Sequence, residues 1–188
     1  MIVLQLRASN SWFNPPIAFF THSPEKLVHA DAVMRDGRLL GSNIVPGVKP
    51  DGTPVKSGVA IRPMNYGNPV RTLIVRFACT QEQEDLFYAT MESLCGVGFG
   101  LRRMLALARP YGSGKPWTER QGLFCSESIA YVFNLIGLVD PNHPKIEANA
   151  VSPRDLMEWY GAQWRFDDVV EFPENAGFWC HATHSPAT

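Results

Sequence analysis

The chain has 188 residues, of which 17 are basic and 18 acidic, and 45% of its residues are hydrophobic. This length and apolar content exclude disorder of the whole chain, and such a chain can bury a core without a metal or a disulfide. The balanced charge argues against a nucleic-acid-binding protein, which concentrates positive charge against phosphates. We expect a single domain over residues 1–188, with a core from about residue 27 to about residue 160.

The sequence predicts neither a membrane span nor a secretory signal. It lacks the run of about 18 apolar residues that a membrane span needs, and its start, MIVLQLRASN, lacks the order of charged and then apolar residues that marks a signal. A chain that is not secreted normally keeps its thiols reduced. We therefore expect all the cysteines to be free, namely Cys79, Cys95, Cys125 and Cys180.

Strands are expected in the first half of the chain. The dipeptide Asp36-Gly37 separates two β-compatible runs, which is the strongest short-range signal of a hairpin. Residues 46–58 are rich in Gly and Pro and predict a flexible connection. The expected strands are 1–7, at an edge of the sheet, 27–35 and 38–45, which form the hairpin, and 71–78.

Helical periodicity begins at Thr80, which forms a possible capping box with Gln83. Further on, Ser152 precedes a proline suited to the first position of a short helix. The expected helices are 80–94, 99–108, 124–136 and one that begins after residue 152. Strands in one half and helices in the other predict an α+β fold, with an antiparallel sheet packed against helices.

Cys125 stands in the first turn of the helix expected over 124–136, on an apolar stripe. Unpaired N–H groups and the positive end of the helix dipole favour a thiolate in a first turn. Such a thiolate can act as a nucleophile, and its own N–H can stabilise an oxyanion. The alternative is a small buried side chain without chemistry.

The hairpin brings a histidine and a carboxylate to one face. A two-residue turn at Asp36-Gly37 sets Asp31 opposite Ser42. Because side chains alternate between faces, His29, Asp31 and Ser42 are expected together, with Asn43 on the other, apolar face. An imidazole beside a carboxylate or hydroxyl can act as a general base. The alternative is a solvated sheet face.

These features in this order resemble the circularly permuted NlpC-type cysteine hydrolases, relatives of papain in which the histidine strand precedes the cysteine helix. LVHADAV, the Asp-Gly hairpin with LLGS, FCSESIAYVFNLIGL and VSPRDL carry the resemblance, which spans residues 27–156. It implies a papain-like fold with Cys125 as the nucleophile and His29 as the base.

Many members of that family have a third polar residue on the strand after the base. Asp31, Ser42 or Asn43 could take that place here, and Asp31 ranks first because a carboxylate best orients an imidazole and stabilises its protonated form. Tyr66 and Ser42 are the candidates for substrate binding.

The resemblance also implies a substrate. Small proteins of this permuted type are often phage-associated and cleave stem-peptide amides of bacterial cell walls, which implies a thiol peptidase or amidase without a cofactor, in the cytoplasm or a phage particle. Arg62, Arg102 and Arg103 are available to pair with the carboxylates of a peptidoglycan fragment. The alternatives are an inactive binding or structural module of a phage tail and a lipid or thioester acyl hydrolase on the same fold.

A metal site is not expected. His22, His29 and Asp31 have the ligand chemistry of a catalytic zinc site, but the spacing of the two histidines is not a recognised ligand spacing. A second polar cluster lies close to the C-terminus, where a flexible tail is expected, and comprises Cys180, His181 and His184.

Overall fold

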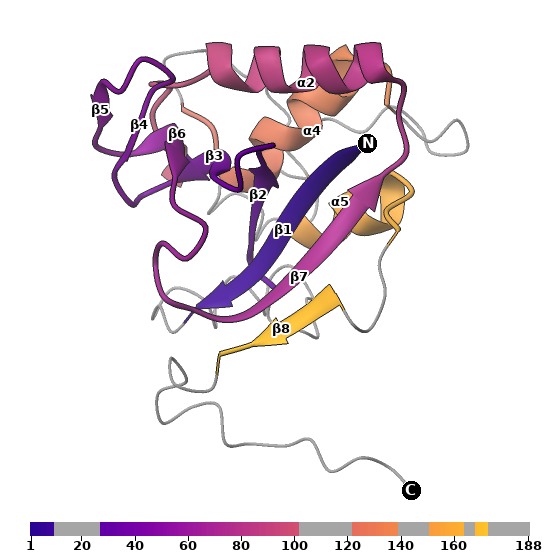
Figure 1. Cartoon of the computed structure of the whole chain (residues 1–188), viewed down its shortest axis with the longest axis horizontal. Coiled ribbons are helices and arrows are strands. Elements are labelled where there is room, and N and C mark those ends of the chain that lie inside the picture. The colour runs from indigo at the N-terminus through magenta and orange to yellow at the C-terminus, as the bar shows by residue number, and fades with distance from the viewer. Residues whose placement is uncertain (10–26, 102–121, 139–150, 164–167, 173–188) are drawn as a thin grey trace, which may run out of the picture.

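A computed structural model describes residues 1–9, 27–101, 122–138, 151–163 and 168–172 (Figure 1). Its strands are β1 (Ile2–Ser9), β2 (His29–Val33), β3 (Leu39–Asn43), β4 (Gly47–Val48), β5 (Pro54–Val55), β6 (Gly58–Arg62), β7 (Pro69–Phe77) and β8 (Val169–Glu171). Its helices are α2 (Gln81–Ser93), α4 (Cys125–Leu135) and α5 (Pro153–Trp159). All eight strands form one antiparallel sheet in the order β5-β4-β6-β3-β2-β1-β7-β8. The predicted α+β class is confirmed.

β1 lies in the interior of the sheet, so the prediction of an edge strand is wrong. It pairs with β2 on one side and with β7 along its length on the other (Figure 1). Ile2, Leu4 and Leu6 are fully buried on one face, and Gln5 and Arg7 are almost fully buried on the other. A strand buried on both faces loses the clear alternation of a half-exposed strand, which explains its weak pattern.

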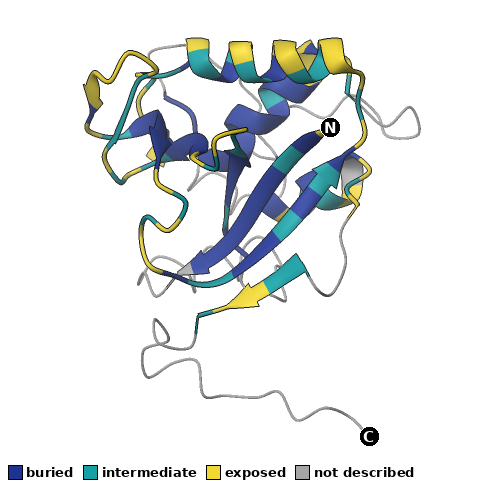
Figure 2. Cartoon of the chain, viewed as in Figure 1, coloured by how far each residue is buried: buried dark blue, intermediate teal, exposed yellow. Residues whose placement is uncertain are grey.

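One hydrophobic core joins the sheet to the helices. Ala30, Ala32 and Leu40 of the central strands share this core with Phe87 of α2 and Phe133 of α4. Figure 2 shows the central strands and α4 buried, whereas α2 exposes its outer side. The apolar stripe predicted for α4 is confirmed, because Cys125, Ile129, Val132, Phe133 and Ile136 are all buried.

The predicted helix starts are confirmed at two of the caps. Thr80 caps α2 and forms the expected capping box with Gln83. Ser152 caps α5, whose first residue is Pro153, and accepts a hydrogen bond from the N–H of Asp155. The helix expected over 99–108 lies almost entirely outside the described residues.

The hairpin exists, but its register differs by one residue from the prediction. The N–H of Met34 donates to the carbonyl of Arg38, and Ala32 pairs with Leu40. The loop therefore has three residues, the last of which is Gly37 with φ +81°, as in hairpins that end in a left-handed residue. Because side chains alternate along a strand, this shift exchanges the faces of Ser42 and Asn43 relative to His29.

The Gly- and Pro-rich connection after the hairpin is not simply flexible. β4 and β5 form a short ribbon within it, and Val48 of β4 pairs with Ile61 of β6. The ribbon turns at Gly52, which has φ +85°. The Gly and Pro content predicted a connection without a helix, but not the two short strands within it.

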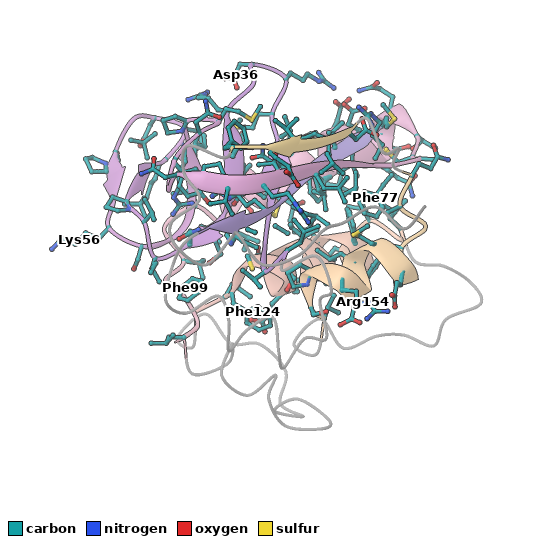
Figure 3. The ribbon with its side chains drawn as sticks, turned by 90° about the horizontal axis from the view of Figure 1, so that it is seen from below. Asp36, Lys56, Phe77, Phe99, Phe124 and Arg154 are labelled. Carbon is teal, nitrogen blue, oxygen red and sulfur yellow. The ribbon has the colours of Figure 1, made fainter. Side chains whose placement is uncertain are left out.

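Three backbone segments pack closely around the start of α4. The N–H of Val59 donates to the carbonyl of Val97, and the N–H of Leu123 donates to that of Gly98, both at 2.9 Å. Phe99 forms a parallel bridge with Leu123, and it lies close to Phe124 in Figure 3. Through residues 97–99, these contacts tie the chain that leads into α4 to β6 and thereby position Cys125.

Gly122 is a position where this packing requires glycine. Its φ is +70°, and an added Cβ would lie 2.5 Å from the carbonyl oxygen of Gly98. We expect Gly122→Ala to lower the free energy of unfolding by roughly 3 kcal/mol. Gly37→Ala is the matched control, because Gly37 also has a positive φ but no heavy atom within 4 Å of the added Cβ. Urea unfolding of both variants checks this, and equal losses would contradict the close packing.

Candidate active site

Cys125 is the first residue of α4, and Phe124 is its N-cap. Its side chain is 6% exposed, and Sγ lies 3.9 Å from the carbonyl oxygen of Val28, just before β2. The hydroxyl of Ser42 on β3 donates to the carbonyl of Leu123. The start of α4 is therefore fixed against both β2 and β3.

The polar residues that follow Cys125 are all buried and bind backbone groups. Ser126 Oγ donates to the carbonyl of Val151 at 2.6 Å, and Ser128 Oγ donates to that of Cys125 at 2.7 Å. The carboxylate of Glu127 accepts a hydrogen bond from the N–H of Phe124. The FCSES segment thus fixes the first turn of the helix, where backbone N–H groups lack acceptors within the helix.

His29 lies at the start of β2, with one ring nitrogen held by a carboxylate. Its Nε2 lies 2.9 Å from Asp31 Oδ2 and 2.9 Å from Tyr66 Oη. The hydroxyl of Tyr66 donates to the same Asp31 oxygen at 2.7 Å. A proton on Nε2 satisfies the carboxylate, and in the neutral ring this leaves the lone pair on Nδ1.

Asn43 completes this network through Tyr66. Its Oδ1 accepts a hydrogen bond from the N–H of Val45, so its Nδ2 is directed toward His29 and Tyr66. Nδ2 lies 3.1 Å from both His29 Nε2 and Tyr66 Oη. Because Nδ2 and a protonated Nε2 are both donors, the bond that forms is the one to Tyr66.

Arg7 makes the carboxylate of Asp31 a stable anion. Its Nη2 lies 3.0 Å from Asp31 Oδ2, and both side chains are buried. Burial opposes the ionisation of Asp31, but His29 and Arg7 outweigh it and hold the pKa of this carboxyl well below its usual range. Asp31 therefore carries a negative charge at every pH at which His29 titrates.

Cys125 and His29 stabilise each other's charged forms. Burial disfavours both charges, yet the attraction of Asp31 and of the Cys125 thiolate raises the pKa of His29. Likewise, burial opposes the thiolate, but the neighbouring His29 lowers the pKa of the Cys125 thiol. The arrangement favours a thiolate and imidazolium pair, and a thiolate in such a pair can act as a nucleophile.

The ionisation of Asp31 should appear in the pH dependence of stability. A carboxyl whose pKa is lower in the folded state stabilises the protein above its unfolded pKa, and that contribution is lost as the pH falls below it. We expect the difference in unfolding free energy between the parent chain and Asp31→Asn to shrink by roughly 2 kcal/mol between about pH 5 and about pH 2. Urea unfolding at several pH values measures it, and a constant difference would contradict the ion pair.

The structure brings His29 and Asp31 together and places Cys125 next to His29, but it separates Ser42 from them. The prediction that Ser42 shares the face of His29 is wrong, because of the register shift. Ser42 is fully buried, and its hydroxyl donates to the carbonyl of Leu123. Asn43, expected on the apolar face, lies beside His29 instead.

Tyr66 and Arg62 also differ from expectation. The hydroxyl of Tyr66, predicted to contact substrate, is directed at His29 and Asp31. Arg62, predicted to pair with substrate carboxylates, is 1% exposed and donates to backbone carbonyls that include those of Gly41 and Val45. Arg62 therefore links β3 and β6 and is not available to a substrate carboxylate.

Sequence reasoning did not identify Arg7 as a site residue. A signal existed, because a charged residue in an apolar strand is rarely buried without a partner. In the structure, Arg7 pairs across the ladder with His29, and Gln5 pairs with Asp31. Once β1 is known to adjoin β2, alternation places all four side chains on one face.

Several predicted positions lie outside the described residues: His22, Arg102, Arg103, Cys180, His181 and His184. Within the described ranges, no group of three or more His, Cys, Asp or Glu side chains could hold a metal ion. Cys79, Cys95 and Cys125 are free thiols, as predicted. In the described part of the chain, no helix combines the length and the apolar character needed to cross a membrane.

A comparison with protein-family models and with curated proteins finds no match for this chain. The function is therefore inferred from the side chains of the site.

Proposed function

We propose that this protein is a papain-like cysteine hydrolase, in which Cys125 attacks a carbonyl carbon and His29 moves the proton. The observation that carries this proposal is the place of the Cys125 thiol, in the first turn of α4 and against the carbonyl of Val28, next to His29, whose attraction lowers the pKa of the thiol. The Nε2 of that histidine is fixed by Asp31. Nucleophile, base and orienting carboxylate are the parts that acyl transfer by a thiol requires.

The first half of the reaction forms a thioester. Sγ of Cys125 attacks the substrate carbonyl carbon, and the carbonyl oxygen takes up the negative charge. When the tetrahedral intermediate collapses, the C–N bond breaks, and His29 donates its Nδ1 proton to the departing amine. The N–H of Cys125, in the first turn of α4, is a candidate donor to the oxyanion.

Water completes the cycle. Neutral His29 takes a proton from a water molecule through Nδ1, and the resulting hydroxide attacks the thioester carbon. The C–S bond then breaks, the carboxylic acid leaves, and the Cys125 thiolate and His29 imidazolium are restored. Asp31 keeps its charge throughout, because it stabilises the imidazolium without taking its proton.

The proposed substrate is an amide bond in a peptidoglycan stem peptide. This choice rests on the resemblance to the permuted NlpC-type hydrolases, which covers the His29 strand, the LLGS hairpin and the Cys125 helix. Phage-associated proteins of that type act on such peptides, so the proposed location is the cytoplasm or a phage particle. Arg102 and Arg103 are the remaining candidates for the carboxylates of the peptide.

The test compares two substrates. Purified protein is incubated with isolated peptidoglycan, where new amines are measured, and with fatty-acyl esters, where free acid is measured. We expect amines from peptidoglycan, and none from the Cys125→Ala variant. Release of free acid from the esters alone would indicate an acyl hydrolase with the same catalytic pair instead of a peptidase. No release from either would favour an inactive binding module.

A further inference from the structure

Arg7 and the three proposed catalytic side chains form a row of alternating charges. When Cys125 is a thiolate and His29 an imidazolium, the charges in the order Cys125, His29, Asp31 and Arg7 are negative, positive, negative and positive. Cys125 and His29 interact, His29 Nε2 lies 2.9 Å from Asp31 Oδ2, and Asp31 Oδ2 lies 3.0 Å from Arg7 Nη2. The row as a whole is neutral.

The position of Arg7 is unusual for a positive charge. It is 4% exposed and lies directly opposite His29 in the β1–β2 ladder, where like charges are destabilising. Asp31 compensates this repulsion, and Tyr66 fixes the guanidinium. The carbonyl of Tyr66 accepts a hydrogen bond from Nη1 at 2.8 Å, and its ring lies 3.6 Å from Cζ.

We propose that Arg7 is a positioning residue that balances the charge of the site and thereby sets the pH range in which the Cys125–His29 pair is ionised. This inference rests on the proposed function and deepens it. With Arg7 present, loss of the thiol proton takes the row from one net positive charge to none. Without Arg7, the same step takes it from none to one net negative charge, which is less favourable in a buried site.

The other charged or titratable groups around His29 do not replace Arg7. Arg62 of β6 lies 5.3 Å from the Tyr66 ring and donates to backbone carbonyls. Glu127 of α4 accepts from the N–H of Phe124. Tyr66 is neutral, because burial and the nearby Asp31 raise its pKa well above the usual value. Asn43 of β3 carries no charge. Among the described residues, Arg7 is therefore the cation that contacts Asp31 besides His29 itself.

The test uses the alkylation of Cys125 and needs no substrate. The rate with iodoacetamide is measured against pH by mass spectrometry of the peptide that contains Cys125, in the parent chain, Arg7→Gln and Arg7→Lys. We expect Arg7→Gln to move the pH midpoint for thiolate formation upward by about one unit, so that alkylation below the midpoint slows about tenfold. Arg7→Lys, which keeps the charge, should leave the midpoint in place.

The outcomes separate this inference from the proposed function. If Cys125 of the parent chain reacts only at the pH of an ordinary thiol, the proposed function fails. If Cys125 reacts at low pH but Arg7→Gln does not move the pH midpoint, the role of Arg7 is overturned. The same holds if Arg7→Lys moves the midpoint as far as Arg7→Gln does. Should Arg7→Gln not fold, the double variant Arg7→Gln/Asp31→Asn is compared with Asp31→Asn. The double variant is expected to have the higher midpoint, and equal midpoints would overturn the inference.

Discussion

Replacing Cys125 with alanine is expected to reduce hydrolysis by more than about a thousandfold, because it removes the proposed nucleophile, without which the acyl intermediate cannot form. The fold should tolerate the change. The thiol is small, and its hydrogen bond to the carbonyl of Val28 is long, with 3.9 Å from Sγ to the oxygen. We expect the thermal midpoint to stay within a few degrees of the parent value. Release of amines from peptidoglycan and a thermal melt provide the two measurements.

Cys95→Ala is the matched control for this prediction. Cys95 is also a free thiol and is half-buried, but burial raises its pKa to about 11, and it makes no contact with His29 among those observed. Its removal should leave turnover at the parent level. Activity retained in Cys125→Ala, or lost equally in both variants, would contradict the assignment of Cys125.

Gly41→Ala should have the second largest effect, although Gly41 carries no chemistry. Gly41 lies beside Asp31 across the β2–β3 hairpin, and an added Cβ would lie 2.2 Å from Asp31 Oδ1. The carboxylate must therefore move, which breaks its hydrogen bond to His29 Nε2. We expect turnover to fall by roughly a hundredfold or more, as when a triad loses its orienting carboxylate. This variant tests the position of Asp31 while every charge of the site is kept.

Gly98→Ala is its control. It adds the same methyl group at a glycine whose φ is not in the left-handed region and where no atom lies within 4 Å. Circular dichroism and urea unfolding show whether Gly41→Ala still folds. A folded Gly41→Ala with parent turnover would show that the position of Asp31 is unimportant, whereas parallel losses in Gly98→Ala would point to a general effect on the fold.

Local signals in the sequence were sufficient for the three helices that the structure describes and for the shared face of His29 and Asp31. Thr80 and Ser152 cap their helices through hydrogen bonds within a few residues, so their sequence context contains the whole interaction. The prediction that His29 and Asp31 share a face requires only the period of two along one strand. The place of Cys125 in the first turn of α4 follows from its apolar stripe.

Contacts between strands could not be predicted in the same way. The register of the hairpin depends on whether two or three residues form the loop, and Asp36-Gly37 is compatible with both. The length of the loop therefore decides whether the side chain of Ser42 or that of Asn43 lies beside His29. Arg7 joins the site because β1 pairs with β2, and Tyr66 joins it through the turn that contains Gly67 and Asn68, both with left-handed φ. None of these long-range pairings is encoded in a local pattern.

In the proposed site His29 keeps Cys125 ionised, and a competition between thiols tests this interaction. The intact chain and a His29→Gln variant are treated briefly with iodoacetamide at about pH 6, where an ordinary thiol is almost entirely protonated. Mass spectrometry then gives the alkylated fraction at Cys79, Cys95 and Cys125. We expect Cys125 to react first in the intact chain and to lose that advantage in His29→Gln. Slow alkylation of Cys125 in the intact chain, or the same fast rate in both proteins, would contradict this role of His29.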